Sequence, residues 1–537
     1  MNPRRMPTKA ELIRLQKLYR TDKRIAETLG NGVTEHLVAY WRRKKGIPTY
    51  SFPKFSVKEI REVWDRFGDD FHAGMELGLS KAAFYNWRRR YKITRKPAAL
   101  KLEQLSLELF TGDTPGRKRL GSGHQTIVQK VLSRSADCKS VDIGQEVEIE
   151  PEMVIAGDSV DEVIEGFNQT GTTYVWNPAR VLIPLDGTIL STASGEAGRY
   201  KSLRDFSRMQ QIQNTFELGE GDGFQVALEK GLVLPGQVIL GCDRTIFACG
   251  CLGVLTFKLS ASETALVWAE GKVGLSVPET VRVNLTGRLS RGVFSRDVAH
   301  HIVAQTQTAD MTGKIIEFYG TAIDQMSISE RFTLCSILHD TGCIGVVCPY
   351  DATTRRYINP RARKPFTPAL ADRNAVYAAE FTFDLNIMKA VVCGPAGPSD
   401  LIPIDEMGGL AVHYIFMGGA VNGRFDDLKI VAEIIKGKKI SPLTRLFIQP
   451  ASRAIYLDAL KRGLIRVFAE AGAIVISPGD PRRLDLREVL APDENGLTTY
   501  HNEITRPGGR LYQVSPATAA VSALTGEITH PAPYVKF

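Results

Sequence analysis

Two neighbouring stretches near the N-terminus share one pattern of apolar and polar positions. They are RIAETLGNGVTEHLVAYWRRKKGI (residues 24–47) and HAGMELGLSKAAFYNWRRRYKI (residues 72–93). In each, an apolar helical segment ends at a glycine, and a short turn leads to Thr34 or Ser80, residue types that favour the N-cap of a following helix. The pattern predicts two copies of a helix-turn-helix unit.

A further helix is predicted ahead of each stretch. ELIRLQKLY (11–19) and VKEIREVWDRF (57–67) have apolar residues at helical spacing, so each would supply the first helix of its unit. Residues 1–96 are therefore expected to form a small all-α, duplicated helix-turn-helix-like module. Residues 97–124 are expected to form a linker, because they end in the Gly-, Pro- and Ser-rich TGDTPGRKRLGSGH.

From residue 125 onward the pattern changes to alternating helix-like and strand-like segments. In chain order these are TIVQKVL, YVWNPARVLIPLD, SLRDFSRMQQIQ and GQVILGCD. Such alternation is typical of α/β architecture, with parallel sheets flanked by helices. The sequence thus predicts a small helical module followed by an α/β core over residues 125–537.

In the second helix of each unit, one face is predicted to pack inward and the other to face outward. The inward positions are Val38, Trp41, Phe84 and Trp87. The outward positions, where a recognition helix would meet the major groove, are Glu35, His36, Tyr40, Lys81, Tyr85 and Asn86. The basic triplets at the helix ends would contact phosphates; they are Arg42, Arg43 and Lys44, and Arg88, Arg89 and Arg90.

Net charge favours the same interpretation. Residues 1–100 contain 23 Lys and Arg against 10 Asp and Glu, or +13, whereas the rest of the chain has 68 − 23 = 45 basic and 59 − 10 = 49 acidic residues, or −4. Such asymmetry indicates a polyanion-binding module attached to a nearly neutral core. Two alternatives stay open: the basic ends are only solvated, or they dock on an acidic protein surface. Asp69, Asp70 and Glu76 in the second copy weigh against nucleic acid.

The lack of long apolar segments and the cysteine pattern predict a reducing compartment for the chain. No stretch of about 18 uncharged apolar residues is present, and the N-terminus carries Glu11 and lacks the apolar region of a secretory signal. A cytoplasmic protein is expected, with its eight cysteines reduced. Cys242, Cys249 and Cys251 lie on one segment, where they form either a metal or redox site or the small-residue packing of a glycine-rich turn.

Five segments, in order along residues 125–530, resemble one enzyme family. They are ALEKGLVLPGQVILGCD, VPETVRVNLTGRLSRGVFSRDVAHHIV, TAIDQMSISERFTLCSI, FMGGAVNGRFDDLKIVAEIIKGKKI and GGRLYQVSPATAAVSALTG. The family is that of aconitase and the 3-isopropylmalate dehydratase large subunit. The resemblance implies a three-lobed core around a cleft. It also implies a separate swivelling domain, which this chain would not include and which a small subunit supplies in the dehydratases.

The same resemblance implies three cysteine ligands for a 4Fe-4S cluster, and this sequence has none of them. The three positions are Ala420, Asp480 and Arg483. Alanine has no donor atom, arginine would repel iron, and aspartate prefers harder cations than a thiolate-held cluster provides. We therefore expect no cluster of the family type.

Other active-site positions of the family are changed as well. Gly187, Phe224, Arg244, Thr245, Cys249 and Glu503 stand where the family has other residues, mostly histidines. The retained positions are Asp186, Asp243, Asp340, Asn422 and Arg424. Losing imidazoles removes general acid-base candidates, so no catalytic residue is assigned.

Three functional hypotheses follow. The first is a cluster-free, non-catalytic protein that binds nucleic acid or acts as a regulatory protein. Its cleft would bind a carboxylate through one or more arginines, namely Arg244, Arg424, Arg482 or Arg483. The alternative is that these arginines are only solvated. The second is a divergent hydro-lyase or isomerase large subunit for a hydroxy di- or tricarboxylic acid, with no metal or with a cation held by Asp186, Asp243, Asp340 and Asp480. The third is a structural subunit whose basic module binds another protein.

Overall fold

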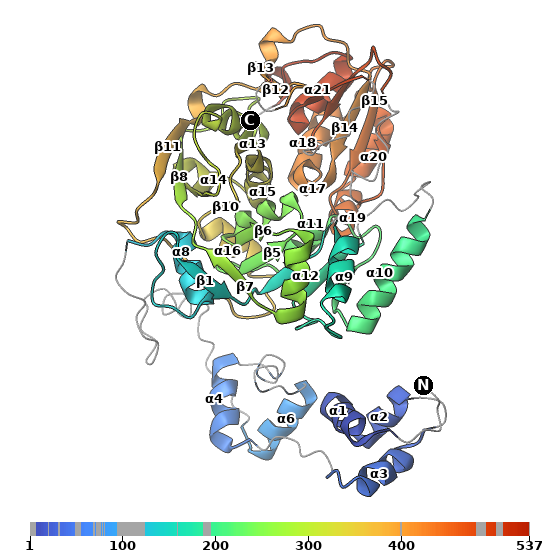
Figure 1. Ribbon diagram of the computed structural model, residues 1–537. Helices are drawn as coiled ribbons and strands as arrows, with labels where there is room; N and C mark the ends of the chain where they lie inside the picture. The colour runs from blue at the N-terminus through green and yellow to red at the C-terminus, as the bar shows by residue number, and fades with distance from the viewer. Residues whose placement is uncertain are drawn as a thin grey trace. The chain divides into compact units, whose positions relative to one another are not determined.

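The computed structural model describes residues 7–19, 21–29, 33–48, 55–67, 70, 73, 77, 79, 81–93, 124–157, 159–185, 195–397, 400–479, 490–500 and 509–535. The chain divides into two units, Met1–Lys118 and Arg119–Phe537 (Figure 1). The division falls inside the segment predicted as a linker, and the finer boundaries stay predictions. Among the described helices, none has both the length and the apolar character needed to cross a bilayer.

The first copy of the N-terminal module consists of helices α1 (Lys9–Tyr19), α2 (Asp22–Leu29) and α3 (Glu35–Lys44). Thr34 caps α3, since its side chain accepts a hydrogen bond from the backbone N–H of Leu37. The buried hydrophobic residues of this copy are Leu12, Ile25, Ala26, Val38, Trp41 and Ile47. The helix predicted over 11–19, the cap and the inward face of α3 are confirmed.

The second copy contains helices α4 (Val57–Phe67) and α6 (Lys81–Arg90). The Glu59 carboxylate accepts hydrogen bonds from the backbone N–H and hydroxyl of Ser56, which fixes the start of α4. Its buried hydrophobic residues are Ile60, Val63, Trp64, Ala73, Phe84 and Ile93, with Trp87 packed against them. The helix predicted over 57–67 is confirmed, whereas the predicted cap Ser80 lies outside the described residues.

The core begins with a five-stranded, all-parallel sheet. Its strands, in spatial order, are β4 (Asn214–Phe216), β3 (Val181–Pro184), β2 (Met153–Ile155), β5 (Val238–Gly241) and β6 (Leu255–Lys258). The helices of this region are α8 (Ile127–Ser135), α9 (Val160–Gln169), α10 (Glu196–Gln210), α11 (Gly223–Glu229), η1 (Arg244–Leu252) and α12 (Ala261–Glu270). β2, β3 and β5 are buried along their whole length, as expected of parallel strands covered on both faces.

A second parallel sheet follows. It has the order β10 (Gly345–Val347), β9 (Ile315–Tyr319), β8 (Thr280–Thr286) and β11 (Ala379–Asp384). An antiparallel pair, β1 (Glu146–Ile149) and β7 (Val273–Ser276), precedes it along the chain. The helices here are α13 (Ser295–Thr306), α14 (Thr321–Gln325), α15 (Ile328–Ile337), η2 (Leu338–Thr341), α16 (Ala352–Ile358) and η3 (Leu385–Ile387).

The third sheet is mixed and has seven strands. Its order is β13 (Leu401–Pro403), β12 (Val391–Cys393), β18 (Arg510–Gln513), β17 (Asn495–Thr498), β14 (Tyr414–Gly418), β15 (Arg445–Gln449) and β16 (Ile474–Val475). β18 to β16 run parallel, and β12 is antiparallel to both of its neighbours. The helices are η4 (Ile404–Glu406), α17 (Gly419–Asn422), α18 (Phe425–Ile435), α19 (Arg453–Lys461), α20 (Leu464–Ala471), α21 (Pro516–Thr525) and η6 (Ala532–Tyr534).

In this third region, α18 packs against both α20 and α21 beside β14 (Figure 1). A continuous cluster of buried hydrophobic residues joins the three sheets, from Met153 in the first to Val514 after the third. The predicted fold class is therefore confirmed: an α/β core with parallel sheets and flanking helices, preceded by a small helical unit.

Candidate functional sites

The glycine turn at Ala420 connects strand β14 to helices α17 and α18. Gly418 has a φ of 134°, and a Cβ at this position would lie 2.0 Å from the carbonyl oxygen of Gln449, so only glycine fits between the neighbouring strands. Ala420 follows in α17 and is 3% exposed, within the main hydrophobic cluster. The chain thus builds the turn that the resemblance implies and places a methyl group where that resemblance implies a thiolate.

These residues do not fit a 4Fe-4S cluster. The Ala420 methyl group cannot ligate iron, and Asp480 and Arg483 lie outside the described residues. Within the described part of the chain, no group of three or more His, Cys, Asp and Glu side chains is placed to hold a metal ion. We therefore assign no step of any reaction to a cluster.

Asn422, a retained family position, belongs to a buried polar network. Its side-chain oxygen accepts a hydrogen bond from Arg296 Nη1 at 2.9 Å, and its Nδ2 donates to Thr333 Oγ1 and to Asp427 Oδ1. Arg296 is fully buried and also donates to the backbone oxygen of Thr499. Burial lowers the pKa of Arg296 to about 10 and raises the pKa of Asp427 to about 7. Both polar groups of Asn422 are thus engaged by neighbouring protein atoms.

Two of the retained aspartates, Asp243 and Asp340, have local structural partners. Asp243 Oδ1 accepts hydrogen bonds from the backbone N–H and the hydroxyl of Thr245, and so caps η1. Asp340 Oδ1 lies 3.1 Å from Nε2 of His339. The predicted anion candidate Arg244 is exposed at the start of η1. Other predicted site residues lie outside the described part of the chain, namely Asp186, Asp480, Arg482, Arg483 and Glu503.

Arg424 is the retained residue whose environment favours ligand binding. It is 3% exposed, and its guanidinium carbon lies 4.2 Å from the centre of the Phe332 ring. Its Nε and Nη1 are buried and have no hydrogen-bond partner among the described residues. The residue also lines a cavity of about 570 Å³. Two buried guanidinium nitrogens without a hydrogen-bond partner cost free energy, so this arrangement favours an acceptor close to them.

Two of the three cysteines singled out in the sequence, Cys249 and Cys251, are packing residues in the described structure. Cys249 and Cys251 are completely buried in η1. Burial raises the pKa of Cys251 to about 12 and that of Cys249 well above its ordinary value, which keeps both thiols protonated. Between them, Gly250 packs directly against the backbone of Val346. This geometry supports the small-residue packing interpretation.

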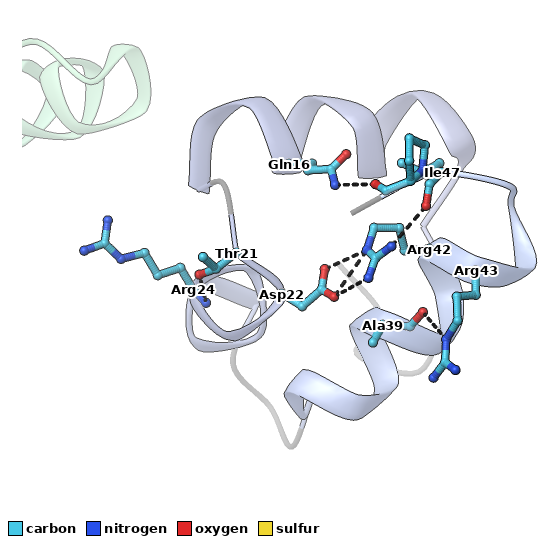
Figure 2. Close-up of polar contacts among 9 residues, drawn as sticks. Gln16, Thr21, Asp22, Arg24, Ala39, Arg42, Arg43 and Ile47 are labelled. Carbon is cyan, nitrogen blue, oxygen red and sulfur yellow. Dashed lines mark hydrogen bonds and ion pairs between the residues drawn. The ribbon is translucent and has the colours of Figure 1, made fainter. Parts of the chain in front are cut away.

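In the first copy of the module, the first arginine of the basic triplet points inward. Arg42 Nε and Nη2 donate hydrogen bonds to the Asp22 carboxylate, and its Nη1 donates to the backbone oxygen of Ile47 at 3.1 Å (Figure 2). Arg42 is 8% exposed. The prediction that Arg42 contacts phosphate is therefore corrected: this guanidinium links the start of α2 to the end of α3.

The second copy repeats this arrangement. Arg88 Nε and Nη2 donate to the two carboxylate oxygens of Asp70, its Nη1 donates to the Ile93 backbone oxygen at 2.8 Å, and its guanidinium lies 4.0 Å from the centre of the Trp64 ring. Arg88 is thus also removed from the set predicted to contact phosphate. Asp70, which the sequence suggested would repel nucleic acid, is neutralised inside the unit.

The remaining basic and aromatic residues do face outward. In α3, Arg43, Lys44 and Tyr40 are exposed, together with Glu35 and His36. In α6 the exposed positions are Tyr85, Asn86, Arg89 and Arg90. The side chain of Lys81 is not described. The outer surface of each second helix therefore combines a tyrosine with a basic pair at the helix end.

Comparisons with known proteins bear on the core. The model of the aconitase family (aconitate hydratase) matches residues 179–526. The 3-isopropylmalate dehydratase large subunit 1 of Methanopyrus kandleri is 33% identical over 417 residues, which cover 76% of this chain and 100% of the relative. The probable methanogen homoaconitase large subunit of Methanosarcina mazei is 34% identical over 372 residues, covering 68% of this chain and 95% of that protein.

Among solved structures, the holo-form of aconitase X from Thermococcus kodakaraensis is similar at a TM-score of 0.41 and 14% identity. The matched region covers 81% of this chain and 97% of the aconitase X chain. The family assignment rests instead on the sequence matches, which extend over well more than half of the chain and over the full length of the Methanopyrus relative. On these matches, the chain belongs to the aconitase family.

Proposed function

We propose that this family member works without a 4Fe-4S cluster and does not perform cluster-dependent dehydration. The observation that carries the proposal is Ala420, a buried methyl group at the first position where the family resemblance implies a cluster thiolate. The engagement of Asn422, Asp243 and Asp340 by neighbouring protein groups supports it, since these side chains already have structural roles.

The chain should fail to assemble an iron-sulfur cluster. After anaerobic reconstitution with ferrous iron and sulfide, the full chain should retain well under one cluster and show no broad absorbance near 400 nm, because the thiolates are missing. A cluster-binding dehydratase large subunit treated in parallel is the positive control. Four irons and four sulfides per chain would contradict the proposal.

A second candidate function is a hydro-lyase large subunit for a hydroxy di- or tricarboxylic acid. The end-to-end match to the Methanopyrus relative favours it, and the name large subunit suggests a small-subunit partner for this chain too. Turnover of such an acid, followed by the absorbance of the unsaturated product, would decide for this candidate, with or without an added small subunit. Turnover together with a stoichiometric metal would identify a replacement cofactor.

We further propose that the N-terminal module binds DNA or RNA in the cytoplasm and that the core binds a small carboxylate without converting it. The exposed tyrosine and basic pair in each copy, Tyr40 with Arg43 and Lys44 and Tyr85 with Arg89 and Arg90, support the first part. Tyrosine can stack on bases while basic side chains contact phosphates. The buried Arg424 supports the second part.

The exposed basic residues of the module should set its affinity for nucleic acid. Replacing Arg43, Lys44, Arg89 and Arg90 by alanine should weaken binding to DNA or RNA oligonucleotides and should lower the slope of log affinity against log salt by about 3, because each lost phosphate contact removes about 0.7–0.9 from the slope. Fluorescence anisotropy over a salt series measures both quantities.

The matched control removes the same number of charges from exposed positions on core helices, namely Lys201, Arg208, Lys429 and Arg466. This variant should bind as the unmodified chain does. Equal slopes for both variants, or no binding even at low salt, would favour a protein partner for the module.

A further inference from the structure

The second helices of the two N-terminal copies, α3 and α6, have the size and the support of helices that enter a DNA groove. Each has ten residues and is therefore about 15 Å long. An α-helix fits the major groove of duplex DNA, which is about 12 Å wide. α3 packs against α2 and α6 against α4, and the largely buried ion pairs Arg42–Asp22 and Arg88–Asp70 fix the helix ends. Each helix is thus held on one side and exposed on the other.

The exposed C-terminal ends of both helices have the same charge pattern. Arg43 and Lys44 are exposed in α3, and Arg89 and Arg90 are exposed in α6, at the same positions relative to the Trp-Arg-Arg motif. Figure 2 shows that the Arg43 guanidinium points away from the inner ion pair. Among the described residues, none of these four cations forms an ion pair, so their charges remain available for phosphates.

The positions nearer the N-terminal ends differ between the copies. In a recognition helix these positions contact base edges. The pairs aligned on the Trp-Arg-Arg motif are Glu35 and Lys81, Ala39 and Tyr85, and Tyr40 and Asn86. Glu35 and Asn86 are both exposed. A carboxylate accepts a hydrogen bond from the amino group of cytosine, whereas an asparagine amide pairs with N6 and N7 of adenine. The two helices therefore suit different bases while they share the same phosphate contacts.

A short stretch of chain joins the two copies. Ile47 is buried in the hydrophobic core of the first copy, and Phe55 packs against the core of the second. Phe55 follows Ile47 by eight residues, which span at most about 28 Å. One turn of duplex DNA is about 34 Å long. A tether of this length gives the second copy a high effective concentration at the duplex that the first copy binds, and favours neighbouring half-sites.

Other nucleic acids suit these helices less well. Duplex RNA has a deep, narrow major groove whose bases side chains cannot read. A single strand is bound along a row of aromatic side chains that stack on successive bases. Among the described side chains, each of the two helices has one exposed tyrosine, Tyr40 in α3 and Tyr85 in α6.

We propose that the N-terminal module binds duplex DNA, with α3 and α6 in the major groove at two neighbouring half-sites of different sequence. Asn86 contacts an adenine, and the two basic pairs contact phosphates. This inference rests on the nucleic-acid binding proposed above, and adds the kind of nucleic acid and the reading of its sequence. Salt-dependent binding without base preference would leave the proposed function standing and would refute this inference.

Selection by the full chain from a pool of random DNA duplexes, each about two helical turns long, tests the proposal. The enriched sequences should contain two unlike half-sites. In fluorescence anisotropy, the full chain should prefer an enriched duplex over an unselected one by on the order of a hundredfold. The same sequence as single-stranded DNA or as duplex RNA should bind more weakly than the DNA duplex.

Three variants at exposed positions separate base contacts from phosphate contacts. Asn86→Ala should lose about tenfold of the preference for one adenine and keep its affinity for unselected DNA, because it removes a base contact and no charge. Arg89→Ala should weaken binding to all duplexes alike and lower the salt slope by about 0.9, with the preferred sequence unchanged. The control Arg61→Ala removes an exposed charge from α4 and should change affinity by less than about twofold.

Three results would overturn the proposal. The first is a selection that enriches no sequence, or one whose two halves are identical. The second is tighter binding to single-stranded DNA or to RNA than to the DNA duplex. The third is an Asn86→Ala variant with an unchanged base preference. If the full chain binds no nucleic acid even at low salt, the nucleic-acid part of the proposed function falls together with this inference.

Discussion

Arg42→Ala is expected to unfold the first copy of the N-terminal module. The substitution removes a bidentate pair with Asp22 and a hydrogen bond to the Ile47 backbone oxygen, and leaves the Asp22 carboxylate without its partner while its side chain is only 13% exposed. Breaking a pair of this kind costs on the order of 3 kcal/mol. A core of six buried hydrophobic residues rarely supplies more than about 3–5 kcal/mol, so the loss is comparable to the whole stability of the unit.

Hydrogen exchange of the full chain, followed by mass spectrometry, would locate this effect. Peptides from α1, α2 and α3 should lose protection in Arg42→Ala, while peptides from the core should not change. Arg43→Ala is the matched control: Arg43 is exposed, bonds only to the Ala39 backbone oxygen among the described residues, and should cost within about 0.5 kcal/mol. Unchanged protection in Arg42→Ala would show that the ion pair does not hold the unit together.

Glu317→Gln is expected to remove part of the pH dependence of core stability. Glu317 is 0% exposed in β9 and accepts hydrogen bonds from the Val128 backbone N–H and the Tyr319 hydroxyl. Burial raises its pKa from 4.5 to about 7. Between pH 4.5 and about 7, the folded protein therefore keeps a proton on Glu317 that the unfolded chain releases. The stabilisation from this proton is fully present below pH 4.5 and is lost as the pH rises through about 7.

The unmodified chain should thus lose more thermal stability between about pH 5 and pH 8 than the variant does, by on the order of 2–3 kcal/mol for this one carboxyl group. Melts of both proteins at several pH values measure the difference. Burial also raises the pKa values of Asp297 and Asp427 to about 7. Both residues are present in the unmodified chain and in the variant, so their effect on the pH dependence cancels in the comparison. Glu270→Gln, at an exposed position, is the control. Parallel plots of melting temperature against pH for the unmodified chain and for Glu317→Gln would refute the expectation.

Local sequence was enough for the helices of the module that the structure describes and for the class of the core. The helices over 11–19 and 57–67 and the cap at Thr34 depend on residues within a few positions of each other, so periodicity and capping preference predicted them. The core strands that were predicted in the segments ending at Asp186 and Asp243 are likewise present as β3 and β5.

The basic triplets show where such local inference fails. Three consecutive cations at a helix end look equivalent in the sequence, yet Arg42 and Arg88 are turned inward by Asp22 and Asp70, which lie 20 and 18 residues earlier. One signal was present in the sequence. Each copy has an aspartate ahead of its Trp-Arg-Arg helix and an isoleucine five residues after the first arginine: Asp22, Arg42 and Ile47, and Asp70, Arg88 and Ile93. When the two copies are aligned, these aspartates fall at the same position of the repeat, as do the arginines. The ion pair that both copies share could therefore have been predicted from the duplication.

The sequence by itself determined which atoms the chain can offer. It has no thiolate at positions 420, 480 and 483, it carries its net positive charge in the first hundred residues, and it has family motifs in a fixed order. The tertiary structure decided which groups meet. Arg296 reaches Asn422 across 126 positions, and the cavity gathers Gln225 of α11, Arg356 of α16 and Arg424 at the N-cap of α18. Chemical identity is local to a residue, whereas burial and partnership arise only when distant segments pack together and exclude water.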